Sequence, residues 1–223
     1  MVAIKGQRRN RKLTYGKGIN DAEYNTQQMH RDDNGVLVLD WACPYYTVWR
    51  DMLKRCLSLK YKNKHPAYTD VICCDEWLTF SNFKSWMEQQ DWEGKQLDKD
   101  LLVEGNNVYS PENCVFVPSL INNFVCKKRT KPKETGTPFG VSKLKSGNYQ
   151  ALLSNTLMKG TYSYLGVFKT AEEAHRAWQK EKVIITKELL NIFCEDTKIC
   201  KGLMRILHKI QRDIDSGNIT TSF

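Results

Sequence analysis

The feature of this sequence that most restricts its fold is a basic, proline-containing segment in the second half of the chain. Residues 127–138 read Lys-Lys-Arg-Thr-Lys-Pro-Lys-Glu-Thr-Gly-Thr-Pro and combine two prolines and one glycine with five cations. Proline and glycine interrupt regular structure, and this composition is typical of a linker. The sequence therefore predicts two modules, one on each side of this segment.

Composition indicates that the modules can fold and that the chain suits a polyanionic partner. The 223 residues are 41% apolar and 11% aromatic, which is enough to bury a core. The formal net charge of +9 favours binding to phosphates, because neutralising them releases counterions. We expect DNA as the partner, with a ribosomal or membrane-surface protein as the alternative.

No segment of the sequence predicts a membrane-spanning or secreted protein. No apolar run approaches the ~20 residues that cross a bilayer, and the chain opens with Met-Val-Ala-Ile-Lys-Gly-Gln-Arg-Arg, which lacks a hydrophobic signal core. The eight cysteines are too few for a disulfide scaffold. We therefore expect a cytoplasmic protein with reduced thiols and no membrane partner.

Residues 1–20 are predicted to form a flexible basic arm. They contain no acidic residue and six cations, Lys5, Arg8, Arg9, Arg11, Lys12 and Lys17. Such arms often lie along a DNA backbone or in a minor groove, so Arg8, Arg9 and Arg11 are candidate DNA contacts. A solvated tail that only aids solubility is the alternative.

Apolar spacing predicts two amphipathic helices within residues 21–126. The first stripe consists of Tyr45, Trp49, Met52, Leu53 and Cys56, and the second of Phe80, Phe83, Trp86 and Met87. Between them, Val-Ile-Cys-Cys at 71–74 predicts a short buried strand or turn.

The pattern after the linker predicts a sheet with one covered face, followed by helices. Tyr149, Ala151 and Leu153 alternate with mostly polar residues. Thr170 and Glu173 form a capping box at the start of a helix, and its apolar stripe is Ala174, Ala177, Trp178 and Val183. We expect this helix to cover the sheet within a module at 139–187. Two further helices, at 188–194 and 198–214, are expected in a C-terminal extension at 188–223, as an appendage or packed back onto the N-terminal module.

The sheet-and-helix module resembles a DNA-binding family. Phe-Gly-Val-Ser-Lys at 139–143, Asn-Tyr-Gln-Ala-Leu-Leu-Ser at 148–154 and Tyr-Leu-Gly-Val-Phe-Lys-Thr-Ala-Glu-Glu-Ala-His-Arg-Ala-Trp at 164–178 resemble the AP2 DNA-binding family. The resemblance implies a three-stranded antiparallel sheet that lies in the major groove and is braced by one helix. Ser142, Leu144 and Ser154 replace contact arginines of the plant-type family, and Tyr164 stands in place of its second strand-borne tryptophan.

The polar residues that remain in this half are the candidate DNA contacts. Amides can read adenine, and lysines can hold phosphates. The candidates are Lys143, Lys145, Asn148, Gln150, Ser154, Tyr162 and Tyr164 in the module, and Lys127, Lys128 and Arg129 in the linker. The alternative is a small module that binds protein and whose tyrosines are ordinary strand residues.

A second resemblance lies before the linker. Leu-Asp-Lys-Asp-Leu-Leu-Val-Glu-Gly-Asn-Asn-Val-Tyr-Ser-Pro-Glu-Asn-Cys-Val-Phe-Val-Pro at 97–118, followed by Ile-Asn-Asn at 121–123, resembles the ββα core of HNH nucleases, especially phage homing endonucleases. Asp98 falls at the acidic position, Asn113 at the central asparagine, and Asn122 or Asn123 at the terminal ligand. Lys99 occupies the position of the general-base histidine.

The resemblance implies a site in which a histidine activates water and two ligands hold one divalent cation. Lysine titrates at about 10.4 and is charged at neutral pH, so Lys99 is no ordinary base. A second arrangement has Mg²⁺ or another divalent cation held by oxygen atoms of Asp98, Asp100 and Asn122, with Lys99 neutralising the transition state. The alternative is a hairpin with solvated acids, in which Asn113 only ties the hairpin to the helix.

The cysteine spacing does not favour zinc, because it contains no paired Cys-x-x-Cys motifs. A four-ligand site could still be assembled from Cys43, Cys56, His65 and Cys73. All four histidines, His30, His65, His175 and His208, are expected at the surface, on polar helix faces or in loops.

Together these patterns predict an α+β fold, with an N-terminal helical region containing an HNH-like ββα core, an AP2-like sheet braced by a helix, and C-terminal helices. Three functions are open. The first is sequence-specific binding of double-stranded DNA with HNH-type cleavage or nicking, in the bacterial host cytoplasm if a phage encodes the chain. The second is a transcription regulator that binds DNA without cleavage. The third is an inhibitor or adaptor with a protein partner, a host nucleoprotein.

Overall fold

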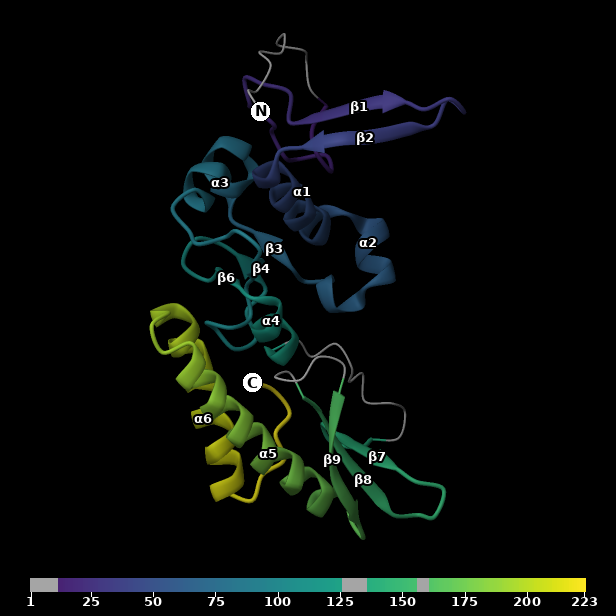
Figure 1. The fold of residues 1–223 in the computed structure, drawn as a ribbon, viewed down its shortest axis with the longest axis vertical. Coiled ribbons are helices and arrows are strands. Elements are labelled where there is room, and N and C mark those ends of the chain that lie inside the picture. Colours follow the sequence, from purple (N-terminus) through teal and green to yellow (C-terminus); the bar gives the residue numbers. More distant parts are fainter. Residues whose placement is uncertain (1–11, 126–135, 156–160) are drawn as a thin grey trace. The chain divides into compact units, whose positions relative to one another are not determined.

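The structure is a computed structural model, which describes residues 12–125, 136–155 and 161–223. These residues form helices and several small sheets (Figure 1), which confirms the predicted α+β class. They belong to two compact units. The first unit comprises the described part of residues 1–93 together with Asn107–Cys114, and the second comprises Gly94–Asn106 and the described part of residues 115–223.

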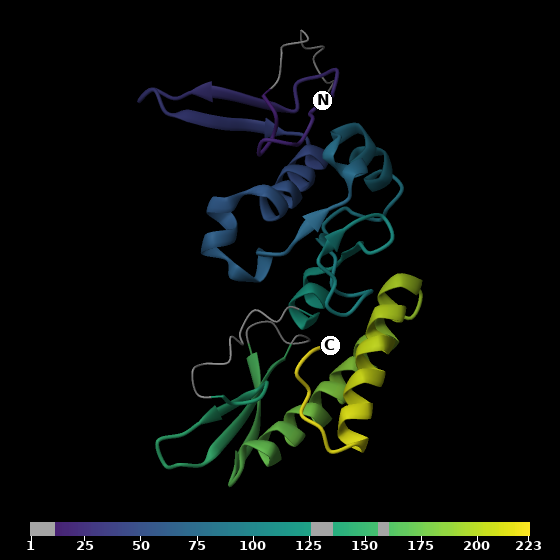
Figure 2. The ribbon, with the colours of Figure 1, turned by 180° about the vertical axis from the view of Figure 1, so that it is seen from behind.

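The first unit contains a hairpin, several helices and a short parallel strand pair (Figure 2). Its elements are β1 (Gln27–Arg31), β2 (Leu37–Ala42), α1 (Pro44–Leu57), α2 (Leu59–Lys64), η1 (Pro66–Tyr68), β3 (Ile72–Cys73), η2 (Asp75–Leu78), α3 (Phe80–Met87) and β5 (Val108–Tyr109). Strands β1 and β2 pair antiparallel, whereas β3 and β5 pair in parallel.

Aromatic side chains form the core of the first unit, and both predicted helices are present as α1 and α3. Trp49, Trp77 and Phe83 are fully buried, and the indole N–H of Trp49 donates to the Trp77 carbonyl at 2.7 Å. The buried stripe of α1 begins at Tyr46 rather than at the predicted Tyr45, which is half-buried. The helical period therefore located the core, with an error of one residue at its start.

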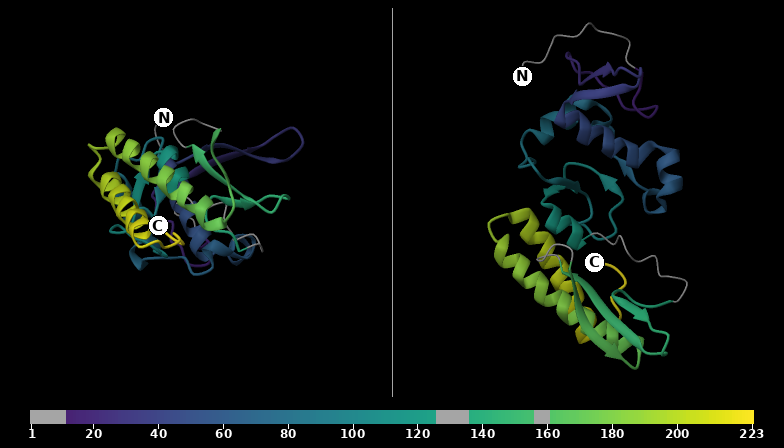
Figure 3. Two further views of the ribbon diagram at one scale, coloured as in Figure 1. Left: turned by 90° about the horizontal axis from the view of Figure 1, so that it is seen from below. Right: turned by 45° about the vertical axis from the view of Figure 1, so that its right-hand side comes forward.

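The second unit contains a strand pair, a three-stranded sheet and three helices among its described residues (Figure 3). Its elements are β4 (Gln96–Asp98), β6 (Val115–Val117), α4 (Ser119–Val125), β7 (Val141–Lys143), β8 (Tyr149–Asn155), β9 (Thr161–Phe168), α5 (Ala171–Ile192) and α6 (Thr197–Asp215). Strand β4 pairs antiparallel with β6, and α4 follows directly. The sheet has the antiparallel order β7-β8-β9.

Helix α5 covers one face of the three-stranded sheet, as predicted. The capping box is present, since the Thr170 hydroxyl accepts from the Glu173 amide and the Glu173 carboxylate accepts from the Thr170 amide. Ala174 of α5 packs against Val141 and Ala151 of the sheet, and all three are buried. Small side chains at this contact let the helix approach the strands closely.

The predicted end of this helix near residue 187 is wrong, because α5 continues to Ile192. The apolar stripe runs on through Ile185 and Leu189, which are buried with Leu203 and Ile206 of α6 in one large core. That core also contains Val117 and Phe124 from β6 and α4, so the C-terminal helices share it with the ββα segment. Within the described ranges, no helix is both long enough and apolar enough to cross a membrane.

Gly140 provides a test of the contact between the sheet and α5. It has φ +72°, and a Cβ atom there would lie 1.9 Å from Cδ1 of Trp178. Gly147 also has positive φ, +88°, but a Cβ there would meet nothing within 4 Å. We expect Gly147→Ala to lower the free energy of unfolding by about 1 kcal/mol through backbone strain. Gly140→Ala should cost about 1–3 kcal/mol more through the clash, as measured by urea denaturation. Equal losses in the two variants would contradict close packing of Trp178 on Gly140.

Candidate functional site

The three-stranded sheet has an open face opposite α5. The β-strand alternation that buries Ala151 and Leu153 turns Gln150, Leu152 and Ser154 to the other face. Strand register places Ser142 beside Gln150 and Tyr164 beside Leu152. The Tyr164 side chain is 62% exposed. This open face therefore combines an amide, hydroxyl groups and an aromatic ring on a support that is braced from behind.

Other candidate DNA contacts lie at the edges of this face. Lys143 pairs with Tyr149 on the helix side, its Nζ 5.9 Å from the Tyr149 ring centroid. Lys145 and Asn148 are exposed in the turn between β7 and β8, which closes through a hydrogen bond from the Leu144 amide to the Asn148 carbonyl. The structure thus brings Gln150, Ser154 and Tyr164 together, with Lys145 and Asn148 at the margin and Lys143 on the helix side.

Several candidates cannot be placed in this way. Tyr162 stands opposite Ser154 in the strand register, and its side chain lies outside the described residues. The arm and linker candidates also lie outside them, namely Arg8, Arg9, Arg11, Lys127, Lys128 and Arg129.

The β4-β6-α4 segment forms the ββα arrangement that contains Asp98. The Asp98 carboxylate accepts hydrogen bonds from the amides of Asp100 (2.9 Å) and Leu101 (2.7 Å). The side chain is buried, and burial raises the pKa of Asp98, with the hydrogen bond from Leu101 opposing the shift. Asp98 therefore holds the turn after β4 in shape.

Lys99 closes the loop that follows. Its Nζ donates to the Asn106 carbonyl at 2.7 Å and to the Asp100 carboxylate at 2.7 Å. In return, the Asn106 side-chain amide donates to the Lys99 carbonyl at 2.7 Å. Lys99 is buried. At the position that the HNH resemblance assigns to a general base, the Lys99 side chain thus donates hydrogen bonds that join two ends of one loop.

The other proposed nuclease residues are arranged differently. Asn122 on α4 donates through its side-chain amide to the Gln96 side chain on β4, which ties the helix to the strand. Asn113 belongs to the first unit, whereas Asp98, Lys99, Asp100 and Asn122 belong to the second. In the part of the chain that the structure describes, no group of three or more His, Cys, Asp or Glu side chains could hold a metal ion.

The residues weighed for zinc separate into three places in the first unit. Cys56 and Cys73 are hydrogen-bonded to each other, which lowers the pKa of the Cys73 thiol. The Cys43 sulfur lies 3.6 Å from the Tyr24 hydroxyl, and the His65 ring lies 4.3 Å from the Tyr61 ring between centroids. Of these four residues, the structure brings together only Cys56 and Cys73.

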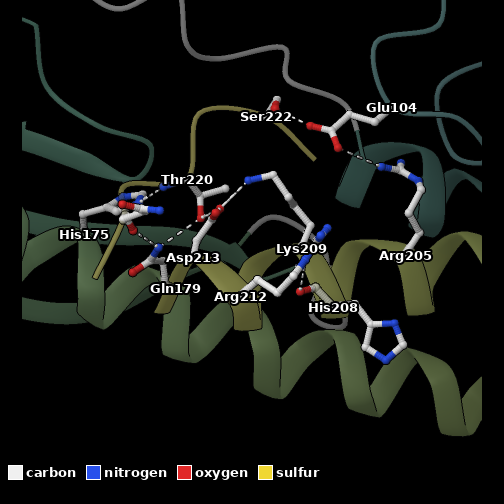
Figure 4. A network of polar contacts seen from close by, with 11 residues as sticks. Glu104, His175, Gln179, Arg205, His208, Lys209, Arg212, Asp213, Thr220 and Ser222 are labelled. Carbon is white, nitrogen blue, oxygen red and sulfur yellow. Dashed lines mark hydrogen bonds and ion pairs between the residues drawn. The ribbon is translucent and has the colours of Figure 1, made fainter. Parts of the chain in front are cut away.

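Sequence analysis missed a buried polar network in the second unit (Figure 4). His175 was expected at the surface but is 1% exposed. Its Nδ1 lies 3.0 Å from the Phe139 carbonyl, and its Nε2 accepts from the Thr220 amide at 3.0 Å. The Thr220 hydroxyl contacts Asp213 at 2.8 Å and Gln179 at 3.0 Å. The position of His175 between Ala174 and Trp178 of the apolar stripe was the available signal, since a stripe has width.

Lys182 is a second buried residue that the apolar pattern did not reveal. Its Nζ donates to the Phe124 carbonyl at 2.8 Å and lies 3.3 Å from the Phe124 ring centroid and 4.8 Å from that of Phe223. Burial lowers the pKa of Lys182 to about 7. The amine therefore connects α5 to Phe124 in the last turn of α4, and its burial costs desolvation energy.

Comparison with known proteins adds no further constraint on this geometry. No protein-family model, curated protein or solved structure matches the chain.

The depressed pKa of Lys182 predicts a pH-dependent stability. The unfolded chain keeps the Lys182 proton up to about pH 10.5 and the folded chain loses it above about pH 7, so the free energy of unfolding should rise between these values. Lys182→Met should remove this rise, which amounts to a few kcal/mol at about 1.4 kcal/mol per pKa unit. Urea denaturation from pH 7 to 10 measures it, with the exposed Lys180→Met as control. Parallel curves for wild type and Lys182→Met would contradict the burial of a titrating amine.

Proposed function

We propose that this chain binds double-stranded DNA in a sequence-specific manner through the open face of β7-β8-β9, as in the AP2 resemblance. The observation that carries the proposal is the one-sided sheet, with exposed Ser154 and Tyr164 and half-buried Gln150 on the face opposite α5. A strand layer fits the major groove, where an amide can form a bidentate pair with adenine. The net charge of +9 supports a phosphate-bearing partner.

We further propose that binding proceeds without cleavage, as expected for a regulator built on an HNH-like scaffold. Both proposed catalytic groups at the turn after β4 already have structural partners. Lys99 donates to the Asn106 carbonyl, and the Asp98 carboxylate accepts from two backbone amides. The Lys99 Nζ is engaged as a donor, and both amides bind Oδ1 of Asp98, so neither of these atoms is placed to take a proton from water.

Metal-dependent cleavage is the second candidate, favoured by one observation. The Asp98 carboxyl is buried with a raised pKa, and Asp100 beside it has a half-exposed side chain. A divalent cation bound by Asp98 and Asp100, with Asn122 as the further ligand of the resemblance, would stabilise the buried negative charge and activate water.

Gln150→Ala tests the proposed DNA-reading face. Loss of a bidentate amide contact should weaken binding to a duplex selected from a random library by about tenfold or more and relax specificity at one base position. Fluorescence anisotropy on selected and shuffled duplexes measures both. Gln89→Ala in the first unit is the matched control, because Gln89 is an exposed glutamine outside both the sheet and α6. If the wild type prefers no duplex sequence and instead captures a nucleoprotein, the adaptor function is favoured.

Incubation with supercoiled plasmid tests the choice between binding and cleavage. We expect protection of a site without scission in Mg²⁺, Mn²⁺ or EDTA, because the Lys99 side chain is engaged as a donor to the Asn106 carbonyl. Nicking that needs the metal and disappears in Asp98→Asn would establish the endonuclease instead. Asp98→Asn keeps an oxygen acceptor for the Asp100 and Leu101 amides, and circular dichroism checks that it folds.

A further inference from the structure

One side of α6 carries a row of basic side chains along the length of the helix, and all but the partly buried Arg205 are exposed. They are Lys198, Lys201, Arg205, His208 and Arg212, spaced by three, four, three and four residues. Because an α-helix has 3.6 residues per turn, this spacing places all five on one side. The opposite side is apolar and buried, with Ile199, Leu203, Ile206 and Ile210. We name the five residues the α6 basic row.

Arg205 fixes the middle of the row to the loop after β4. Its Nε and Nη2 donate to the Leu101 carbonyl at 3.3 and 3.1 Å, and Nη2 also donates to the Asp100 carbonyl at 3.1 Å. Glu104 Oε2 lies 3.8 Å from Arg205 Nη1 (Figure 4). Arg205 therefore ties the middle of the row to the loop that Asp98 and Lys99 hold.

The C-terminal part of the row borders a hollow in the surface. An open depression is lined by Arg205, His208, Gln211 and Arg212, a set with cations and an amide but no acid. Figure 4 shows Arg205, His208 and Arg212 as neighbouring side chains of α6. A concave surface lined by one sign of charge concentrates ions of the opposite sign. The charges of Arg205 and Arg212 therefore favour an anion such as phosphate beside this part of the row.

The length of the row distinguishes a polymer from a single anion. From Lys198 to Arg212 the helix rises by about 21 Å, at 1.5 Å per residue. One DNA strand presents a phosphate about every 3.4 Å along the duplex axis. We propose that the α6 basic row binds the phosphate backbone of a DNA duplex as a sequence-independent contact, separate from the open sheet face. This inference rests on the proposed DNA binding and adds its electrostatic contact.

The salt dependence of binding tests the row. In Lys198→Gln/Lys201→Gln/Arg212→Gln, Arg205 is kept because it holds the loop. The slope of log affinity against log salt is negative, and each lost phosphate contact makes it shallower by about 0.9. The three substitutions should therefore make the slope shallower by about 2.7. Affinity for a fluorescein-labelled duplex of random sequence should fall on the order of a hundredfold at physiological salt. The control Arg176→Gln/Lys180→Gln/Lys187→Gln removes equal charge from exposed positions on α5 and should leave the slope unchanged.

The outcomes separate this inference from the proposed function. Equal slopes for wild type and row variant, with Gln150→Ala still losing sequence preference, would overturn the row and leave the sheet face standing. Equal loss in row and control variants would indicate a general charge effect and also overturn it. A wild type that binds no duplex would overturn both. Inorganic phosphate at matched ionic strength should displace DNA no better than chloride, and stronger displacement would reassign the row to free phosphate.

Discussion

The continuous apolar stripe of α5 packs on the three-stranded sheet at one end and on α6 at the other. Ala174 contacts the sheet, while Ile185 and Leu189 enter the large core with α6, β6 and α4. With 22 residues, the helix is about 33 Å long. Each of these elements is too small to bury its apolar side alone, so the second unit depends on this one helix to join them.

Patterns that depend on neighbouring residues could be predicted from the sequence. The capping box of Thr170 and Glu173, the alternation in β8 and the helical stripes of α1 and α3 are each set by local geometry. Such features need no knowledge of the partner element. The face of the sheet that carries Gln150 and Ser154 follows from the same alternation.

Features that depend on tertiary contacts were not predictable in this way. The sequence around residue 187 contains no helix breaker, and only the packing of Leu189 on α6 explains why α5 continues there. His175 and Lys182 are polar residues whose burial depends on acceptors far along the chain, at Phe139 and Phe124. The partner of Lys99, the Asn106 carbonyl, likewise belongs to a loop whose path no local pattern specifies.

The backbone of α5 is unbroken between its contact with the sheet and its contact with the large core. Helix geometry therefore sets both the distance and the relative rotation between Ala174 and Leu189. One residue inserted in the middle of α5 would rotate its two ends by about 100° and separate them by about 1.5 Å. The length of α5 therefore fixes the distance and the rotation between its contact with the sheet and its contact with α6.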